Sequence, residues 1–256
     1  MQMVAISREE VRNKFNTYLS RFDQTDEAIR LKLVHSFKVG GLCACITESL
    51  GLPRSDVDLA WLIGLLHDIG RFEQVRRYHT FVDGHSMDHA GYGASYLFSE
   101  GHIRDFLSDD AADDIIREAV GQHSAYRLEV DLTERQRLFC QIVRDADKID
   151  IFRVYAVYAF GKKNMLHVNI SDLETSAVSE PVMEAARRRK AVPAELAQTT
   201  IDFYVGMLCL YFELVYPISP EIVREQGNYR KLLAVHSRNE ETEERLNELH
   251  RLIGEV

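Results

Sequence analysis

Apolar residues recur every three or four positions along most of the chain, which is the spacing of one face of an α-helix. The first such stretch covers residues 7–22 and presents on one face Val11, Phe15, Leu19 and Phe22. Residues 26–50 continue the pattern, and Gly51-Leu52-Pro53 is typical of a helix end. No stretch alternates for long enough to predict a strand. The pattern therefore predicts an all-α protein.

The same spacing predicts further helices at residues 55–69, 87–100, 109–124, 133–159, 200–216 and 241–253. Ser55 with Asp58, and Thr133 with Gln136, have the spacing of a capping box, which satisfies free N–H groups at a helix start. Gly70 is expected to end the helix that Ser55 opens. Residues 71–85 are rich in Arg, Tyr, His and Asp and are expected to be irregular.

The charge and apolar content limit the partners that this chain can take. Its formal net charge is −9, and an acidic surface repels the phosphates of nucleic acids, so we expect no stable nucleic-acid binding. A bound cation could still attract a small phosphorylated substrate into a cleft. The best candidate for a membrane span, residues 203–215, is too short and contains Glu213, so no membrane insertion is expected.

The four cysteines are expected to be reduced, because the N-terminal residues lack the apolar segment of a secretory signal. This predicts a cytoplasmic protein. Cys43 and Cys45 have no second cysteine pair to complete a zinc site, so apolar packing is their expected role.

Histidine and aspartate side chains recur on faces that look buried. His67 and Asp68 directly follow an apolar helical run, where both could reach one ion over the helix end. His35 lies one turn from apolar residues on the preceding predicted helix, and Asp147 shares a face with Val143. A buried imidazole or carboxylate needs a partner, and a divalent metal would provide one.

The order of these residues resembles the H…HD…D signature of the HD superfamily of metal-dependent phosphohydrolases. The resemblance extends over residues 28–155 and implies an all-α HD-domain bundle in which one metal is bound by His35, His67, Asp68 and Asp147. The implied metal is Fe, Mn, Co, Ni or Zn, with Mg as the alternative.

Two more histidines fall between the HD pair and the final aspartate. In dinuclear members of the superfamily this interval supplies two further ligands, which implies a second metal on His89 and His123, with Asp68 as the bridge. The alternative is that each is a capping or core histidine, and His85 could take the place of His89. One metal or two therefore stays open.

The candidate catalytic residues are Asp68, Arg71 and Lys148. Arg71 and Lys148 each lie close in sequence to a predicted ligand and could hold a substrate phosphate. The alternative is that both form salt bridges with the ligand carboxylates.

Two parts are expected, with residues 1–155 as the metal-binding bundle. Residues 156–256 are expected to form a helical cap on the same core, because their apolar positions follow helical spacing and need a partner surface. The polar stretch 160–180 would border the site entrance.

The implied function is hydrolysis of a phosphomonoester or phosphodiester, in a nucleotide or another small phosphorylated metabolite. A di-iron oxygenase and a non-catalytic regulator are the alternatives, and a homodimer is left open. The glycine-tyrosine-proline motif of cyclic-dinucleotide phosphodiesterases is absent, so the subfamily is not assigned.

Overall fold

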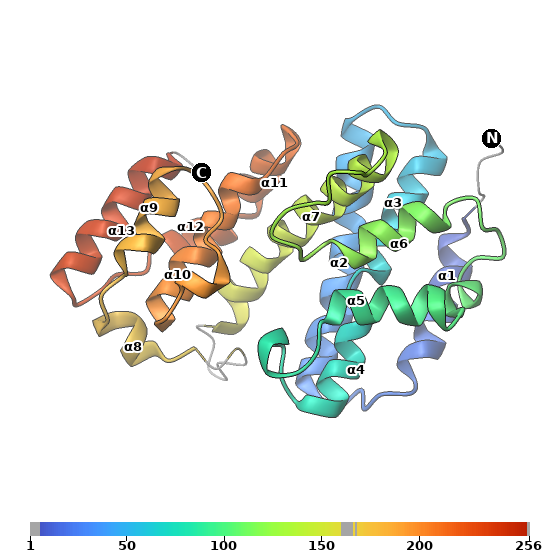
Figure 1. Ribbon diagram of the computed structural model, residues 1–256, viewed down its shortest axis with the longest axis horizontal. Helices are drawn as coiled ribbons and strands as arrows, with labels where there is room; N and C mark the ends of the chain where they lie inside the picture. Colours follow the sequence, from blue (N-terminus) through green and yellow to red (C-terminus); the bar gives the residue numbers. More distant parts are fainter. Residues whose placement is uncertain (1–5, 160–165, 167, 255–256) are drawn as a thin grey trace. The chain divides into compact units, whose positions relative to one another are not determined.

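The computed structural model describes residues 6–159, 166 and 168–254, and every regular element in these residues is a helix (Figure 1). The predicted all-α class is therefore confirmed. The chain divides into two compact units, Met1–Asp147 and Lys148–Val256. The packing of the C-terminal part on the first stays a prediction.

The described residues of the first unit form seven α-helices connected by turns and short 3₁₀ or π segments. They are α1 Arg8–Leu19, α2 Glu27–Ser49, α3 Arg54–Leu66, α4 Ile69–Tyr78, α5 His89–Ala94, α6 Asp113–Gly121 and α7 Glu134–Val154, which crosses into the second unit.

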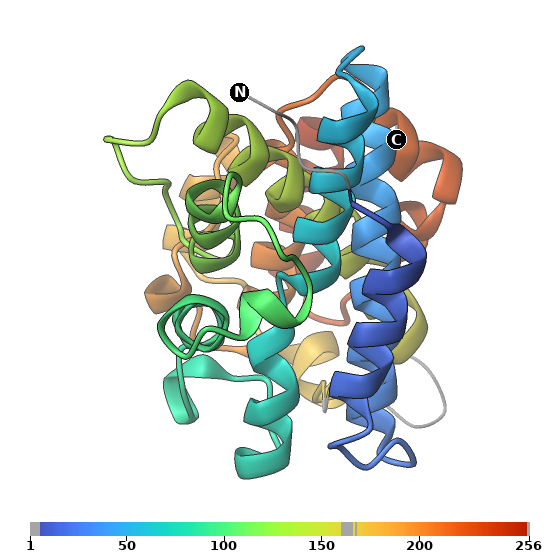
Figure 2. The same ribbon diagram turned by 90° about the vertical axis from the view of Figure 1, so that its right-hand side faces the viewer.

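Two glycines let α2 and α3 approach each other closely. The two helices lie side by side in both views of the chain (Figures 1 and 2). A Cβ atom on Gly64 of α3 would lie 2.8 Å from the Cα of Gly40 on α2 and 2.7 Å from the Cys43 sulfur. Real Cβ atoms need more room, so the contact depends on the absence of a side chain. His35 precedes this contact on α2, and His67 directly follows the last residue of α3, so the contact brings the two histidines toward each other.

Several predicted helix starts are confirmed by their hydrogen bonds. The Ser7 hydroxyl accepts a bond from the Glu10 amide at 3.3 Å, and it caps α1. Thr133 and Gln136 form the predicted reciprocal box, in which each side chain accepts from the other residue's amide, at 2.9 and 3.2 Å.

The prediction for residues 55–85 was wrong in three respects. Pro53, not Ser55, caps α3, since Asp58 pairs with Arg8 and Arg54 instead of closing a box. Gly70 does not end a helix, because α3 ends at Leu66 and Gly70 lies in the first turn of α4. Residues 71–78 are helical rather than irregular.

Aromatic packing explains why the charged stretch after Gly70 is helical. Phe72 is fully buried, and its ring lies 6.0 Å from that of Phe15, 5.9 Å from Tyr18 and 5.7 Å from Phe22. The Tyr18 hydroxyl also donates to the Ile69 carbonyl at 2.9 Å. These tertiary contacts outweigh the weak apolar pattern of α4, which its charged side chains obscure in the sequence.

Beyond α7, the part of the second unit that the structure describes forms six further α-helices: α8 Ile170–Thr175, α9 Glu180–Arg187, α10 Thr200–Cys209, α11 Ile218–Gln226, α12 Asn228–Leu233 and α13 Glu240–Ile253. Buried hydroxyls join α10 to α12, since Tyr204 donates to the Leu232 carbonyl and Tyr229 to the Leu208 carbonyl, both at 2.6 Å. Of the predicted entrance segment 160–180, residues 160–165 and 167 lie outside the described residues, and α8 falls within it. In the described part of the chain, no helix combines the length and apolarity needed to cross a bilayer.

Gly70 offers a test of this packing. A methyl group at Gly70 would collide with the His89 carbonyl oxygen, so Gly70→Ala is expected to lower the free energy of unfolding by about 1–3 kcal/mol. Gly41→Ala is the matched control, because Gly41 lies exposed on α2 with no atom within 4 Å of its Cβ position. Helix propensity predicts that this change stabilises the protein by up to about 1 kcal/mol. Denaturant unfolding measures both, and equal effects would contradict the close approach of α4 to α5.

Candidate metal centre

Six predicted ligands come from five places in the first unit and converge in its interior. His35 lies on α2, His67 and Asp68 form the junction of α3 and α4, and His89 begins α5. His123 follows α6, and Asp147 lies on α7. The four histidines and Asp68 are at most 4% exposed, and the Asp147 side chain is 15% exposed.

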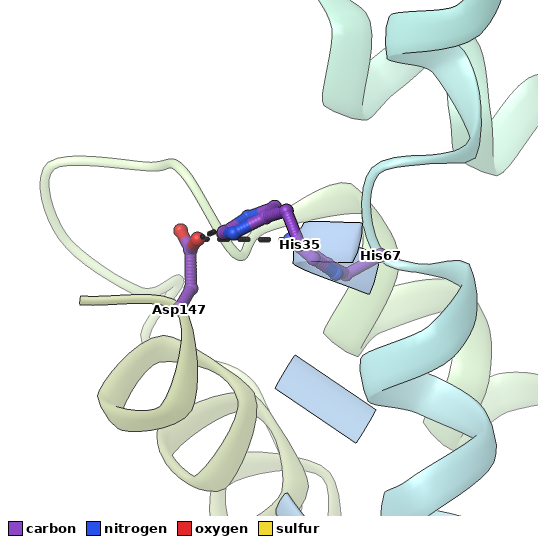
Figure 3. Close-up of side chains that lie close together, drawn as sticks. All are labelled: His35, His67 and Asp147. Atoms are coloured by element: carbon purple, nitrogen blue, oxygen red, sulfur yellow. Dashed lines mark ion pairs between the residues drawn. The ribbon is translucent and has the colours of Figure 1, made fainter. Parts of the chain in front are cut away.

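The first group of ligand atoms surrounds one oxygen of Asp68. The Oδ2 atom lies 3.4 Å from Nε2 of His35 and 3.5 Å from Nε2 of His67. The carboxylate of Asp147 points toward the same two imidazoles, at 3.1 Å from His35 and 3.6 Å from His67 (Figure 3). His35, His67 and Asp147 can offer three ligand atoms that all lie within 4.8 Å of one another.

The second group surrounds the other oxygen of the same carboxylate. Asp68 Oδ1 lies 3.3 Å from Nε2 of His89 and 3.5 Å from Nε2 of His123. His85, considered in the sequence as a substitute for His89, has an exposed side chain. Asp68 therefore presents one oxygen to each group, which is the arrangement that a carboxylate bridging two cations requires.

The hydrogen bonds on the outer ring nitrogens define which nitrogen faces the centre. Nδ1 of His67 and of His123 each lies 2.8 Å from a backbone carbonyl, that of Gly64 or Val120. A carbonyl can only accept, so each Nδ1 carries a proton, and in this tautomer the lone pair of Nε2 faces inward.

These inward lone pairs fit a bound cation. Nε2 of His89 and Nε2 of His123 lie only 3.0 Å apart, and the Nδ1 of each ring already has its own acceptor. Nε2 of His67 is buried and makes no hydrogen bond. Buried nitrogens that face one another in this way need a shared positive charge, and a divalent metal would supply it.

The pKa values of the carboxylates favour the ionised, ligand form. Burial alone raises the pKa of Asp68, but the Lys32 ammonium and the surrounding imidazoles outweigh it and hold that pKa well below its usual value. Burial also raises the pKa of Asp147, but contacts with His35 and His67 outweigh burial and hold this pKa well below its usual value.

The histidines of the second group differ in pKa. Burial lowers the pKa of His123 to about 4, so its ring is neutral near pH 7. For His89, burial is outweighed by the carboxylates of Asp68 and Asp83, which raise its pKa. The negative charge around His89 thus attracts a proton, and a metal cation would satisfy the same demand.

Asp83 is a functional candidate that the sequence interpretation missed. Its Oδ2 lies 2.6 Å from Nδ1 of His89, and its Oδ1 accepts from Arg71 at 2.5 Å and from Gln74 at 2.9 Å. Burial raises the pKa of Asp83, but its bonds with His89 and Arg71 lower it to about 2. A carboxylate behind a ligand histidine orients the ring and fixes its tautomer. The Asp83-Gly84 turn six residues before His89 is the signal that could have indicated it.

Arg71 lies where it can brace the centre. Besides Asp83, its guanidinium donates to the Phe81 carbonyl and to Gln74, both at 2.6 Å. Its Nε is 3.7 Å from Asp68 Oδ1. Of the two predicted roles for Arg71, this geometry favours the salt-bridge role over binding of a substrate phosphate.

Lys148 is the first residue of the second unit, and its role stays a prediction.

Two further cations were missed in the sequence. Lys32 lies three residues before His35 on α2, and its ammonium is 2.5 Å from Asp68 Oδ2. Arg144 is buried on α7, and it donates to the carbonyls of Gln122 and His123 at 3.2 Å each, which ties the His123 turn to α7. Neither contact has a sequence pattern, because each joins segments far apart in the chain.

Comparison with known proteins agrees with this geometry. Residues 33–151 match the family model of the HD domain, a range that includes all six predicted ligands. The chain therefore contains an HD domain, and the predicted resemblance is confirmed. HD domains bind divalent metals and define a superfamily of metal-dependent hydrolases. No curated protein and no solved structure matches the chain.

The number of bound metals can be tested by elemental analysis of the purified protein. We expect two divalent ions per chain, and His89→Ala or His123→Ala should lower this toward one while the fold is retained, because each removes a nitrogen near Asp68 Oδ1. His85→Ala is the control, since the His85 side chain is exposed. Unchanged stoichiometry in both ligand variants would contradict the second position.

The bracing role of Arg71 makes a separate prediction. Arg71→Ala removes the cation that holds Asp83 against His89, and metal affinity should fall about 10- to 100-fold. Arg127→Ala is a matched control, because Arg127 is exposed and contacts Tyr126. Metal titration of the stripped proteins measures the change. If Arg71→Ala binds metal normally but fails to bind phosphate, Arg71 acts on the substrate instead.

Proposed function

We propose that this protein is a metal-dependent phosphohydrolase that acts on a phosphomonoester or phosphodiester, such as a nucleotide or another small phosphorylated metabolite. The observation that supports the proposal most is the shared Asp68 carboxylate, with two imidazoles against each of its oxygens. One metal would be bound by His35, His67, Asp68 and Asp147. The other metal would be bound by His89, His123 and the same Asp68.

Bound divalent cations would activate water for attack on phosphorus and neutralise the charge that develops on the phosphoryl oxygens. The protein's own groups prepare the site for this chemistry. The carbonyls of Gly64 and Val120 and the Asp83 carboxylate hold three imidazoles in the tautomer that turns a lone pair inward. Because these groups are fixed before substrate binds, little reorganisation is needed during the reaction.

The reaction class suits the rest of the chain. The net charge of −9 disfavours long polyanions, whereas a small phosphate ester can be attracted by the local positive charge of a loaded centre. The proposed substrate is therefore a small molecule rather than a nucleic acid.

A turnover screen tests the proposal. The full chain, loaded in turn with Mn, Fe, Co, Ni, Zn or Mg, would be assayed for phosphate release from nucleotides, phosphomonoesters and cyclic dinucleotides. We expect metal-dependent release from at least one class, and loss of activity by about 10³-fold or more in Asp68→Asn, which weakens both positions.

The same screen separates the two alternatives. Oxygen consumption by the iron-loaded protein without phosphate release would identify an oxygenase. Substrate binding without any turnover, in a protein that retains its metals, would indicate a regulator. Lys38→Ala serves as a control for surface charge, because Lys38 is exposed on α2.

A further inference from the structure

Lys32 places a positive charge where the site is already expected to hold metal cations. Its ammonium lies 2.5 Å from Oδ2 of Asp68, and its side chain is only 14% exposed. The Phe81 ring lies 5.3 Å from the same ammonium, so the loop after α4 covers it. Lysine rarely occupies such a position without an anionic partner, because desolvating an ammonium is costly.

The charges of the site indicate what that partner would be if two divalent metals are bound. The four imidazoles are neutral as ligands, and Asp68 and Asp147 contribute two negative charges against four positive charges from two divalent cations. Arg71 and Asp83 cancel each other, since they form an ion pair at 2.5 Å. Lys32 adds a further positive charge. A buried excess of this size needs an anion of more than one negative charge.

Lys32 also has hydrogen-bond donors to offer beside the ligand carboxylate. Arg71 is anchored through its Nη1 atom, which donates to Gln74, to the Phe81 carbonyl and to Asp83, while its buried Nε makes no hydrogen bond. An ammonium has three donors, of which one is directed at Asp68. If the Asp68 carboxylate shares its charge with metal, the others are available to phosphoryl oxygens.

We propose that Lys32 binds the phosphoryl group of the substrate, and that it makes the centre select a terminal phosphate over an internal phosphodiester. A terminal phosphate carries about two negative charges near neutral pH, whereas a diester carries one. This inference rests on the proposed phosphohydrolase function and narrows its substrate to phosphomonoesters or terminal phosphates of nucleotides.

Lys32→Met tests the inference, since methionine keeps an apolar stem of similar length and removes the ammonium. The metal-loaded full chain would be titrated calorimetrically with inorganic phosphate and with dimethyl phosphate. We expect the variant to bind phosphate about tenfold or more weakly, and to lose most of its preference over dimethyl phosphate. Lys38→Met is the matched control, because Lys38 lies exposed on the same helix.

Metal content is a second readout, and it distinguishes phosphate binding by Lys32 from a purely structural role of this residue. Lys32 repels cations at the neighbouring ligands, so Lys32→Met should hold at least as much metal as the unchanged protein. Loss of metal from the variant, or unchanged phosphate affinity, would overturn the inference. Lys32→Arg keeps the charge and should retain phosphate binding. If Lys32→Met does not fold, Lys32→Gln takes its place. Equal phosphate affinity in Lys32→Gln and in the unchanged protein would then overturn the inference.

The outcome is separable from the proposed function. Lys32-dependent phosphate binding in a protein that hydrolyses no phosphate ester would leave the inference standing and refute the phosphohydrolase. Phosphate release from a substrate, together with unaltered phosphate binding in Lys32→Met, would support the phosphohydrolase and overturn the inference about Lys32.

Discussion

A single buried carboxylate, that of Asp68, is the constraint around which the first unit is organised. Its two oxygens lie in separate groups, one against His35 and His67 and the other against His89 and His123. Burial alone would favour the protonated form of this group. The surrounding imidazoles and the Lys32 ammonium reverse that preference and lower its pKa well below the usual value. The helices of the unit therefore surround a fixed negative charge that attracts cations.

The backbone places this carboxylate through two close approaches. The contact of Gly40 with Gly64 brings α2 against α3, and the break between α3 and α4 turns His67 and Asp68 into the same interior. Gly70 then lets the start of α5 lie against α4, which positions His89. Each approach depends on a missing side chain, because protein interiors leave no room for an added methyl group at such contacts.

The loop after α4 links the second group of ligands to the rest of the unit. Arg71 and Gln74 hold Asp83, and Asp83 holds His89. The same Arg71 binds the Phe81 carbonyl, and the Phe81 ring covers Lys32. Arg71 therefore contacts both Asp83, which orients His89, and the loop whose Phe81 ring covers Lys32. Arg71 is anchored through Nη1 to this loop, whereas the Lys32 ammonium is directed at Asp68.

The sequence by itself determined the helical class and most helix positions through helical periodicity. It indicated the six-residue cluster through the H…HD…D residues and the two histidines between the HD pair and the final aspartate, because such spacings are properties of the linear chain. It did not reveal α4, whose helix is stabilised by the aromatic rings of Phe15, Tyr18 and Phe22 from another segment. Nor did it reveal Asp83, Lys32 or Arg144, since a lone charged residue has no pattern that distinguishes it from a surface charge. Only the tertiary structure decided their roles, because these depend on contacts between distant segments, whose distances and burial no local pattern encodes.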